Sequence, residues 1–412
     1  MSWSAAGIDH LRMDFILIAR EPGVNKSEAC REFNISRKTG YKWLARYAAG
    51  GVAALVDTSR RPISSPLRVS GDVVVELVRL RGKHEYRGPK KLRAMLLRRG
   101  FSPDVVPSLA TIGRILRRSG LSKTKGRGRP PKQRPTGPLS SAEGPNDVWT
   151  VDFKGWWLTR DGRRCEPLTI RDLYSRFLLC LRPVARRRTE EVRAVFEEAF
   201  GRYGLPDVIR SDNGSPFASL TGPCGLTRLS AWWRTLGIKL ERIEPGHPEQ
   251  NGGHERMHGD LAREVQRQPA ATVAEEELRL ERWRVEFNME RPHEALGMRV
   301  PGEVYHPSSQ KLSDARPYVY PLDYERRRVS KDGCILLQGQ TVYLSEALSR
   351  QDVGLERLSE SCRRVWFCDL VVGEIVWDGN GYTRRPAAPA CQPPPPDCNP
   401  SPDNNVLPMS CS

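Results

Sequence analysis

The chain has 412 residues, of which 38% are hydrophobic and 28% are charged. This length suits several domains of roughly 100–200 residues each, with enough apolar side chains for packed cores. The net charge of +17 and the pI of about 9.7 suggest a polyanionic partner and favour a nucleic acid over a merely solvated basic surface.

The sequence predicts neither export nor a membrane span. It does not begin with a basic and then apolar stretch, and no apolar run approaches the ~18 residues of a membrane span. Its 10 cysteines show no Cys-x-x-Cys pair and no regular spacing, which favours free thiols over a disulfide framework. We therefore expect a cytoplasmic protein that has no contact with membranes.

Residues 9–57 are expected to form a helix-turn-helix domain that binds DNA. Apolar positions recur at helical spacing, a short helix follows over 27–33, and Ser36 is a good N-cap for the next helix. A tight turn before a helix that begins with basic residues is typical of this motif, whose second helix enters the major groove. An ordinary helical hairpin is the alternative, and in either case Trp43 is expected in the core. The candidate DNA contacts are Arg37, Lys38, Thr39 and Lys42.

Residues 71–120 follow a polar linker and suggest a second helix-turn-helix-like domain. Arg87-Gly88-Pro89 opens one of its helices, and Ser108 caps another. Two such domains would read a longer DNA sequence than one, because each covers only a few base pairs.

Residues 121–145 form a basic linker. Arg127-Gly-Arg129-Pro within it is similar to an AT-hook core, in which arginines enter a narrow minor groove. A solvated basic tether without base preference remains the alternative for so short a motif.

Three acidic residues stand out in the following region. Asp152 lies in the middle of an apolar strand, Asp212 follows a second short strand, and Glu255 lies at the start of a helix. A carboxylate in an apolar strand is costly unless it is paired or binds a metal, and carboxylate oxygens are preferred by hard cations such as Mg²⁺.

These acids belong to three motifs in a fixed order. They read Trp-x-x-Asp152-Phe, then Ser-Asp212-Asn-Gly-x-x-Phe, then Pro-x-x-Asn-Gly-x-x-Glu255. In this order they resemble the retroviral-integrase-like DDE transposases of bacterial insertion sequences. The resemblance covers about residues 146–306 and implies an α/β ribonuclease-H-like catalytic core with a mixed five-stranded sheet.

The pattern of residues agrees with such a core. Residues 165–171 and 177–184 are expected to continue the first strand as an antiparallel meander, with Asp172 between them as a turn or hydrogen-bonding residue. Thr189 would cap a helix, and the strand at 208–210 would return as a parallel neighbour of the first. Asp212 would then lie beside Asp152.

The resemblance implies what these residues do. Asp152, Asp212 and Glu255 would be catalytic and would hold two Mg²⁺ ions ~4 Å apart, with Mn²⁺ as a possible substitute. The enzyme would cut DNA at transposon ends and transfer the 3′-hydroxyl into target DNA, as a homo-oligomer associated with the bacterial nucleoid. Glu249 is a lesser candidate for the third acid. The further candidate DNA contacts are Asn213, Asn251 and Arg263.

Two alternatives stay open. The chain could be a DNA-binding regulator whose catalytic core is silent. The segment His254-Glu-Arg-Met-His258 also fits the zinc-protease pattern, in which both histidines bind Zn²⁺ and Glu255 is the base, although that reading leaves Asp152 and Asp212 unexplained.

The C-terminal part changes character. Short strands separated by Gly-containing turns over 317–385 predict a small β-barrel, used for DNA or subunit contacts or simply for packing. Residues 386–412 are Pro-rich and expected to be disordered.

Overall fold

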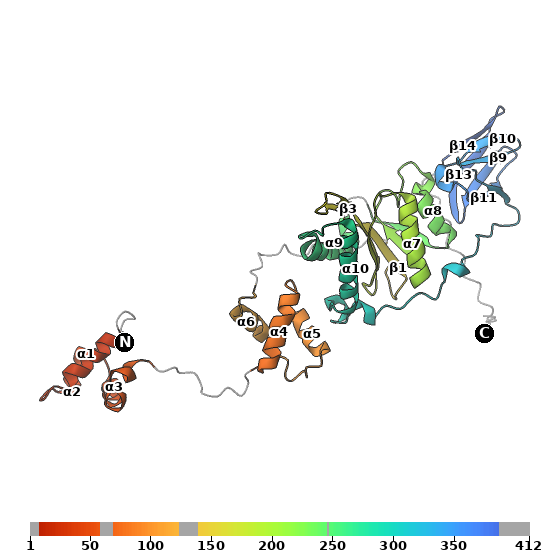
Figure 1. Cartoon of the computed structure of the whole chain (residues 1–412). Coiled ribbons are helices and arrows are strands. Elements are labelled where there is room, and N and C mark those ends of the chain that lie inside the picture. Colours follow the sequence, from red (N-terminus) through yellow and green to blue (C-terminus); the bar gives the residue numbers. More distant parts are fainter. Residues whose placement is uncertain (1–7, 58–68, 123–138, 245–246, 387–412) are drawn as a thin grey trace, which may run out of the picture. The chain divides into compact units, whose positions relative to one another are not determined.

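The computed structural model describes residues 8–57, 69–122, 139–244 and 247–386 (Figure 1). The chain divides into two compact units, Met1–Val69 and Ser70–Ser412. The arginines of the predicted AT-hook, Arg127 and Arg129, lie outside the described residues, as does the Pro-rich tail beyond residue 386.

The first unit is a three-helix domain around a small apolar core. Phe15, Cys30 and Trp43 are buried there, one from each helix, so Trp43 is a core residue as predicted. The Ser36 hydroxyl accepts a hydrogen bond from the backbone N–H of Thr39 at 3.2 Å, which confirms Ser36 as the N-cap. The helices are α1 (Ile8–Ala19), α2 (Lys26–Glu32) and α3 (Arg37–Gly50).

The second unit begins with another group of three helices. Leu77, Leu92 and Ile112 are buried among them, and Ser108 caps the last helix through the backbone N–H of Thr111. The helices are α4 (Gly71–Lys83), α5 (Pro89–Arg98) and α6 (Leu109–Arg118).

A mixed five-stranded sheet follows, in the order β5-β4-β1-β6-β7. Strand β1 pairs antiparallel with β4 and parallel with β6, and β4 pairs antiparallel with β5, as the sequence predicts. The strands are β1 (Val148–Phe153), β4 (Pro167–Asp172), β5 (Leu178–Pro183), β6 (Val208–Ser211) and β7 (Lys239–Arg242).

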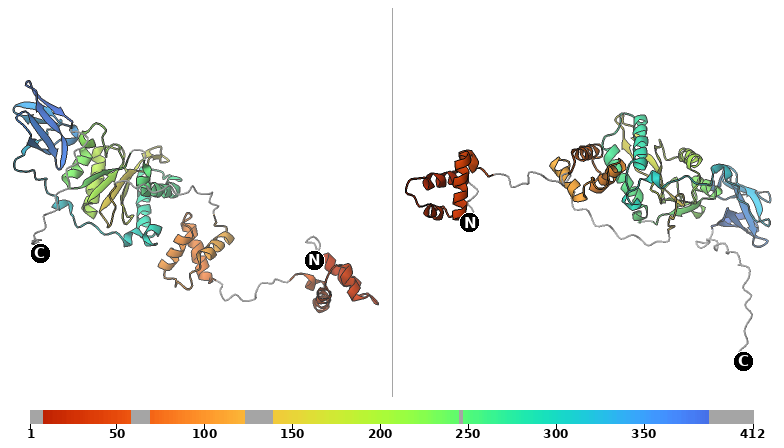
Figure 2. Two further views of the ribbon diagram at one scale, coloured as in Figure 1. Left: turned by 180° about the vertical axis from the view of Figure 1, so that it is seen from behind. Right: turned by 90° about the horizontal axis from the view of Figure 1, so that it is seen from below.

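Helices cover both faces of this sheet (Figures 1 and 2). One apolar core joins Trp149 and Val151 of β1 to α7 (Thr189–Tyr203) and α8 (Arg228–Thr235). A second core lies between Leu178 and Leu181 of β5 and the helices α9 (Gly252–Leu261) and α10 (Val273–Met289). Side chains alternate along a strand, so the even-numbered residues of β1 face α9.

Two predictions within this core need correction. The expected strand 165–171 is divided, because Cys165 pairs with Trp157 in a separate hairpin of β2 (Trp157–Leu158) and β3 (Arg164–Cys165). Thr189 is the first residue of α7 and makes no cap, since Arg188 holds the N-cap position. In α8, Trp232 and Trp233 are both buried in the core.

The C-terminal part contains two antiparallel sheets around one apolar core. The five-stranded sheet has the order β14-β13-β12-β11-β8 and stays open, so the predicted β-barrel is not confirmed. Its edge strands are rich in arginine, and charged edges discourage further strand pairing. The strands are β8 (Glu325–Arg328), β9 (Cys334–Leu337), β10 (Gln340–Tyr343), β11 (Asp352–Arg357), β12 (Cys362–Phe367), β13 (Leu370–Trp377) and β14 (Tyr382–Arg385).

Within the described residues, the structure contains no helix with the length and apolar character needed to span a bilayer.

Candidate active site

Asp152 and Asp212 lie at the same level on neighbouring parallel strands. In the register of β1 and β6, Val148 pairs with Val208 and Thr150 with Arg210. Two residues further along, this register sets Asp152 opposite Asp212, which directly follows β6. Two acids far apart in sequence are thereby brought together, as the predicted crossover requires.

The environment of Asp152 disfavours the negatively charged form of its carboxyl group. Burial, followed by the nearby charge of Asp212, raises the pKa of Asp152 to about 7, and the charge of Glu255 acts in the same direction. A bound cation would relieve this repulsion. The site therefore has the electrostatic character of a metal-binding carboxylate cluster.

Glu255 belongs to the first turn of α9 and is exposed. Its charge reaches Asp152, but its carboxylate and those of Asp152 and Asp212 do not form a group of close ligand atoms among the described residues. The side chain of Glu249, the lesser candidate, lies outside the described residues.

A different set of ligand atoms is close together beside Asp152. Within the described parts of the chain, atoms of Asp152, His254 and His258 lie within 4.8 Å of one another. His254 is fully buried, however, and both its ring nitrogens are engaged. Nε2 lies 2.7 Å from the Thr150 hydroxyl, and Nδ1 lies 3.1 Å from the Thr169 hydroxyl.

The two histidines therefore attach α9 to the sheet. His258 Nε2 also lies 3.1 Å from the Thr169 hydroxyl, and burial, aided by Lys154 and Arg171, lowers the pKa of His258 to about 3. A zinc protease needs a free ring nitrogen on each histidine to bind one ion. In His254, both ring nitrogens are instead hydrogen-bonded to threonine hydroxyls of β1 and β4. This geometry disfavours the zinc-protease alternative.

Family models match most of the regions described above. Two models of the integrase core domain match residues 142–248 and 236–301, and two models of homeodomain-like domains match residues 11–56 and 39–116. The chain belongs to the integrase-core DDE transposases. Enzymes of this family are polynucleotidyl transferases that use divalent metal ions, and the homeodomain-like domains bind DNA.

Two insertion-element proteins are similar to this transposase. It is 28% identical over 231 residues to an uncharacterized 31.7 kDa protein of insertion element IS407 from Burkholderia multivorans, covering 56% of this chain and 78% of that protein. It is 28% identical over 290 residues to an uncharacterized 39.2 kDa protein of IS476 from Xanthomonas euvesicatoria, covering 69% and 79%. Among solved structures, the HTLV-2 integrase catalytic core domain in complex with magnesium matches at 15% identity and a TM-score of 0.30, over 40% of this chain and 100% of that one.

The candidate DNA contacts of the transposase core have partners inside the protein. The Asn213 side chain donates to the carbonyl of Ile243 at 2.7 Å, and the Asn251 side chain donates to the Asp152 carboxylate at 3.4 Å. Arg263 pairs with Asp260, and its guanidinium lies 5.8 Å from the centre of the Tyr86 ring. DNA contacts by these three residues remain predictions, whereas Asn251 directly supports Asp152.

The candidate contacts of the N-terminal domain lie together at the start of α3. Arg37, Lys38 and Lys42 are exposed there, and Thr39 takes part in the Ser36 cap. A cationic helix start with its long side chains in solvent suits phosphate and base contacts in a major groove.

Sequence reasoning missed two cations near the acids of the transposase. Lys154 follows Asp152 by two residues, one position beyond the end of β1. Burial lowers the pKa of Lys154, and the nearby charge of Asp152 opposes this shift. Arg187 lies with its guanidinium 4.5 Å from the centre of the Phe153 ring and pairs with Glu166 at 2.9 Å. The spacing from Asp152 could have identified Lys154, whereas nothing in the sequence links Arg187 to β1.

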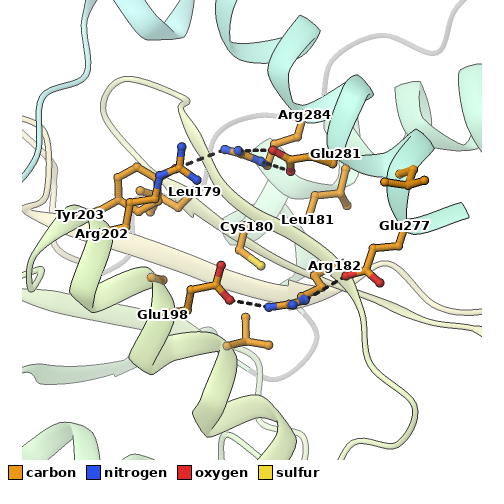
Figure 3. Close-up of a pocket in the computed structure, with 13 residues that line it drawn as sticks. Leu179, Cys180, Leu181, Arg182, Glu198, Arg202, Tyr203, Glu277, Glu281 and Arg284 are labelled. Atoms are coloured by element: carbon orange, nitrogen blue, oxygen red, sulfur yellow. Dashed lines mark hydrogen bonds and ion pairs between the residues drawn. The ribbon is translucent and has the colours of Figure 1, made fainter. Parts of the chain in front are cut away.

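A cavity of about 290 Å³ opens beside β5, between α7 and α10 (Figure 3). Its lining includes Arg182, which pairs with Glu198 and Glu277, and Arg284, which pairs with Glu281. The candidate catalytic acids do not line it. Because these charges compensate one another, the cavity is a poor candidate for the chemistry of the transposase.

Proposed function

We propose that this transposase uses Asp152, Asp212 and Glu255 to hold two Mg²⁺ ions, cuts DNA at transposon ends and joins the new 3′-hydroxyl to target DNA. This proposal rests on the pairing of β1 with β6, whose register sets Asp152 opposite Asp212, together with the raised pKa of Asp152. Mn²⁺ would substitute for Mg²⁺, because both accept oxygen ligands.

The chemistry of the proposed ligands suits hard divalent cations. All three are carboxylates, and the repulsion that acts on Asp152 is of the kind that a cation would relieve. Since Glu255 is exposed at the start of α9, its side chain is free to turn toward the two aspartates.

When bound, the metal ions supply activation of a water and stabilisation of the leaving 3′ oxygen. Asp152 and Asp212 are the fixed members of the site, each at the end of a strand. Asn251 orients one oxygen of Asp152 by donating a hydrogen bond to it. Lys154, one residue beyond the end of β1 and close enough for the charge of Asp152 to act on it, is suited to a phosphate of the bound strand.

The N-terminal domain would bring the DNA ends to this site. Arg37, Lys38, Thr39 and Lys42 would contact the transposon ends, and two ends held together would require more than one copy of the chain. The complete set of acids makes a catalytically silent regulator the less favoured reading.

The test is strand nicking of DNA that carries the ends of the element. Purified wild type should nick this DNA with Mg²⁺ or Mn²⁺, and Asp152→Asn and Asp212→Asn should abolish nicking while DNA binding remains. Lys311→Gln, a substitution outside the site, is the control and should cut normally. Wild type that binds the ends but never cuts with either metal would support the regulator instead.

A further inference from the structure

The β2–β3 hairpin has one buried and one open face. Trp157 and Cys165 point into the core beneath α9 and α10, whereas Trp156 and Leu158 are 53% and 51% exposed. Trp156 directly precedes β2, and exposure alternates over Trp156, Trp157 and Leu158, so Trp156 and Leu158 share the outer face. Arg164 lies opposite Leu158 in the register. A large aromatic ring is thus presented to solvent beside a cation.

Both ends of the hairpin are fixed. At its base, the Lys154 backbone N–H donates to the carbonyl of Pro167 at 3.1 Å. At its tip, the backbone N–H groups of Arg160 and Asp161 donate to the carbonyls of Ala270 and Ala271, each at 3.0 Å. A hairpin held in this way presents its outer face with little loss of entropy on binding.

Arg164, the arginine beside Trp156, is also held in place. The guanidinium of Arg164 lies 4.9 Å from the centre of the Trp156 ring and 2.9 Å from the carboxylate of Glu166. Glu166 is only 4% exposed, and its carboxylate also accepts a hydrogen bond from Arg187. Arg187 in turn lies over the ring of Phe153, the residue that follows Asp152 in the chain. One buried acid therefore holds two arginines in a row that leads from the outer face toward the active-site strand.

The outer face is close to the proposed catalytic acids. Trp156 lies four positions after Asp152 in the chain, a stretch that spans at most about 14 Å. Nucleotides along one DNA strand are spaced by ~3.4 Å. A strand whose phosphate lies at the carboxylates therefore has bases within about four nucleotides of the hairpin.

We propose that the outer face of the hairpin, formed by Trp156, Leu158 and Arg164, binds an unpaired base of the DNA strand next to the active site. This inference rests on the proposed function, since it places the base relative to a phosphate at Asp152. An indole stacks on any base, and the adjacent arginines contact the phosphates. A base that is stacked inside a duplex cannot reach the ring, so the site selects single-stranded or forked DNA.

Charge favours DNA over a second copy of the chain as the occupant. Arg160, Arg163 and Arg164 are exposed around the hairpin, and two identical copies of such a face would repel each other. Asp161, the exposed acid of the hairpin, accepts hydrogen bonds from the hydroxyl of Thr159 and the backbone N–H of Arg163.

The experiment compares two DNA probes on the full chain carrying Asp152→Asn, in metal-free buffer. The probes are a fluorescein-labelled oligo-dT of about 20 nucleotides, which covers one to several single-strand sites, and a blunt duplex of the same length. Trp156→Ala, Trp156→Phe and the control Trp377→Ala, another exposed tryptophan, are each added to this background. Fluorescence anisotropy gives the affinity for each probe, and sedimentation gives the oligomeric state.

Trp156→Ala should weaken oligo-dT binding roughly tenfold and leave duplex binding unchanged, because one stacking contact is lost. Trp156→Phe should retain most of the affinity, and Trp377→Ala should behave as the background chain. Equal losses on both probes, no loss, or equal losses for Ala and Phe would overturn the proposal. A changed oligomeric state with unchanged DNA affinity would also overturn it, by assigning the face to a second copy.

Neither probe requires cleavage, so this result is separate from the nicking test. Nicking without a selective loss in Trp156→Ala would overturn the base site alone. A selective loss without nicking would overturn the proposed function alone.

Discussion

His254 Nε2 lies 2.7 Å from the hydroxyl of Thr150, across the contact between α9 and β1. The other ring nitrogen of His254 lies 3.1 Å from the hydroxyl of Thr169 on β4. Glu255 is the next residue after His254. The buried imidazole therefore fixes the start of the helix that carries the proposed third acid.

We expect His254→Ala to impair both stability and metal use. Loss of a buried ring that bonds two hydroxyls should lower the free energy of unfolding by about 2–4 kcal/mol. At a temperature where the variant remains folded, half-maximal nicking should require more Mg²⁺, because Glu255 is less well positioned. Denaturant unfolding and Mg²⁺ titration of nicking measure the two effects.

His306→Ala, which removes an exposed histidine, is the control and should change neither quantity. His254→Asn keeps part of the hydrogen bonding and should recover part of the Mg²⁺ affinity. A folded His254→Ala variant with a normal Mg²⁺ requirement would contradict the positioning role.

The raised pKa of Asp152 predicts that its carboxylate destabilises the metal-free protein at high pH. Burial and the charge of Asp212 raise the pKa of Asp152 to about 7 in the folded state, from its ordinary value of 3.8 in the unfolded chain. Between these values the folded chain holds the extra proton, so stability falls as pH rises through this window. Asp152→Asn should therefore stabilise the metal-free protein at pH ~8 by on the order of 2–4 kcal/mol.

Thermal unfolding of both chains in EDTA, from pH ~4 to pH ~8, measures this difference. The advantage of Asp152→Asn should nearly vanish near pH ~4, where wild-type Asp152 is protonated in the folded state and still roughly half protonated in the unfolded state. Added Mg²⁺ should stabilise wild type more than the variant. If Asp152→Asn is less stable than wild type at pH ~8 without metal, the folded state does not disfavour the charged form of Asp152.

The predictable parts of the fold are those set by local periodicity. The helix predicted to begin at Thr189 is α7, and the apolar residues that recur at helical spacing along it are buried, including Val192, Phe196 and Phe200. The order of strands follows from the handedness of the crossover, which brings Asp212 beside Asp152 without any knowledge of side-chain contacts.

The unpredicted parts depend on contacts between distant segments. Trp232 and Trp233 are both buried because α8 is covered on two sides, with Leu229 facing the sheet and Ala231 facing the C-terminal core. The edge strands β8 and β14 read as polar arginine-rich segments, so neither they nor the open sheet could be foreseen. The docking of His254 on two threonines likewise has no signal in the sequence.

A buried ion pair attaches the second group of helices to the core. Arg87 is 2% exposed and pairs with Glu286 of α10, to which His84 Nδ1 also lies at 3.2 Å. Arg87→Ala leaves Glu286 without its main partner and should cost about 3–5 kcal/mol. Denaturant unfolding of the full chain measures the cost.

The same interface provides the matched control. Lys90 and Glu294 also pair across it, but both side chains are 58% exposed, so Lys90→Ala should cost no more than about 1 kcal/mol. The double variant Arg87→Met with Glu286→Leu should recover much of the loss, because apolar side chains of similar size can replace a buried pair. Equal costs for Arg87→Ala and Lys90→Ala would mean that this ion pair does not hold the interface.

The exposed lysines at the start of α3 predict a change in the salt dependence of DNA binding. Replacing Lys38 and Lys42 together with glutamine removes two phosphate-binding charges, so the slope of log K against log salt should become less negative by about 1.8. The affinity should fall on every duplex sequence, since phosphate contacts carry no base information. The control Lys331→Gln removes an exposed charge from the C-terminal part and should leave the slope unchanged. A double variant with the wild-type slope would exclude α3 as the phosphate-contacting helix.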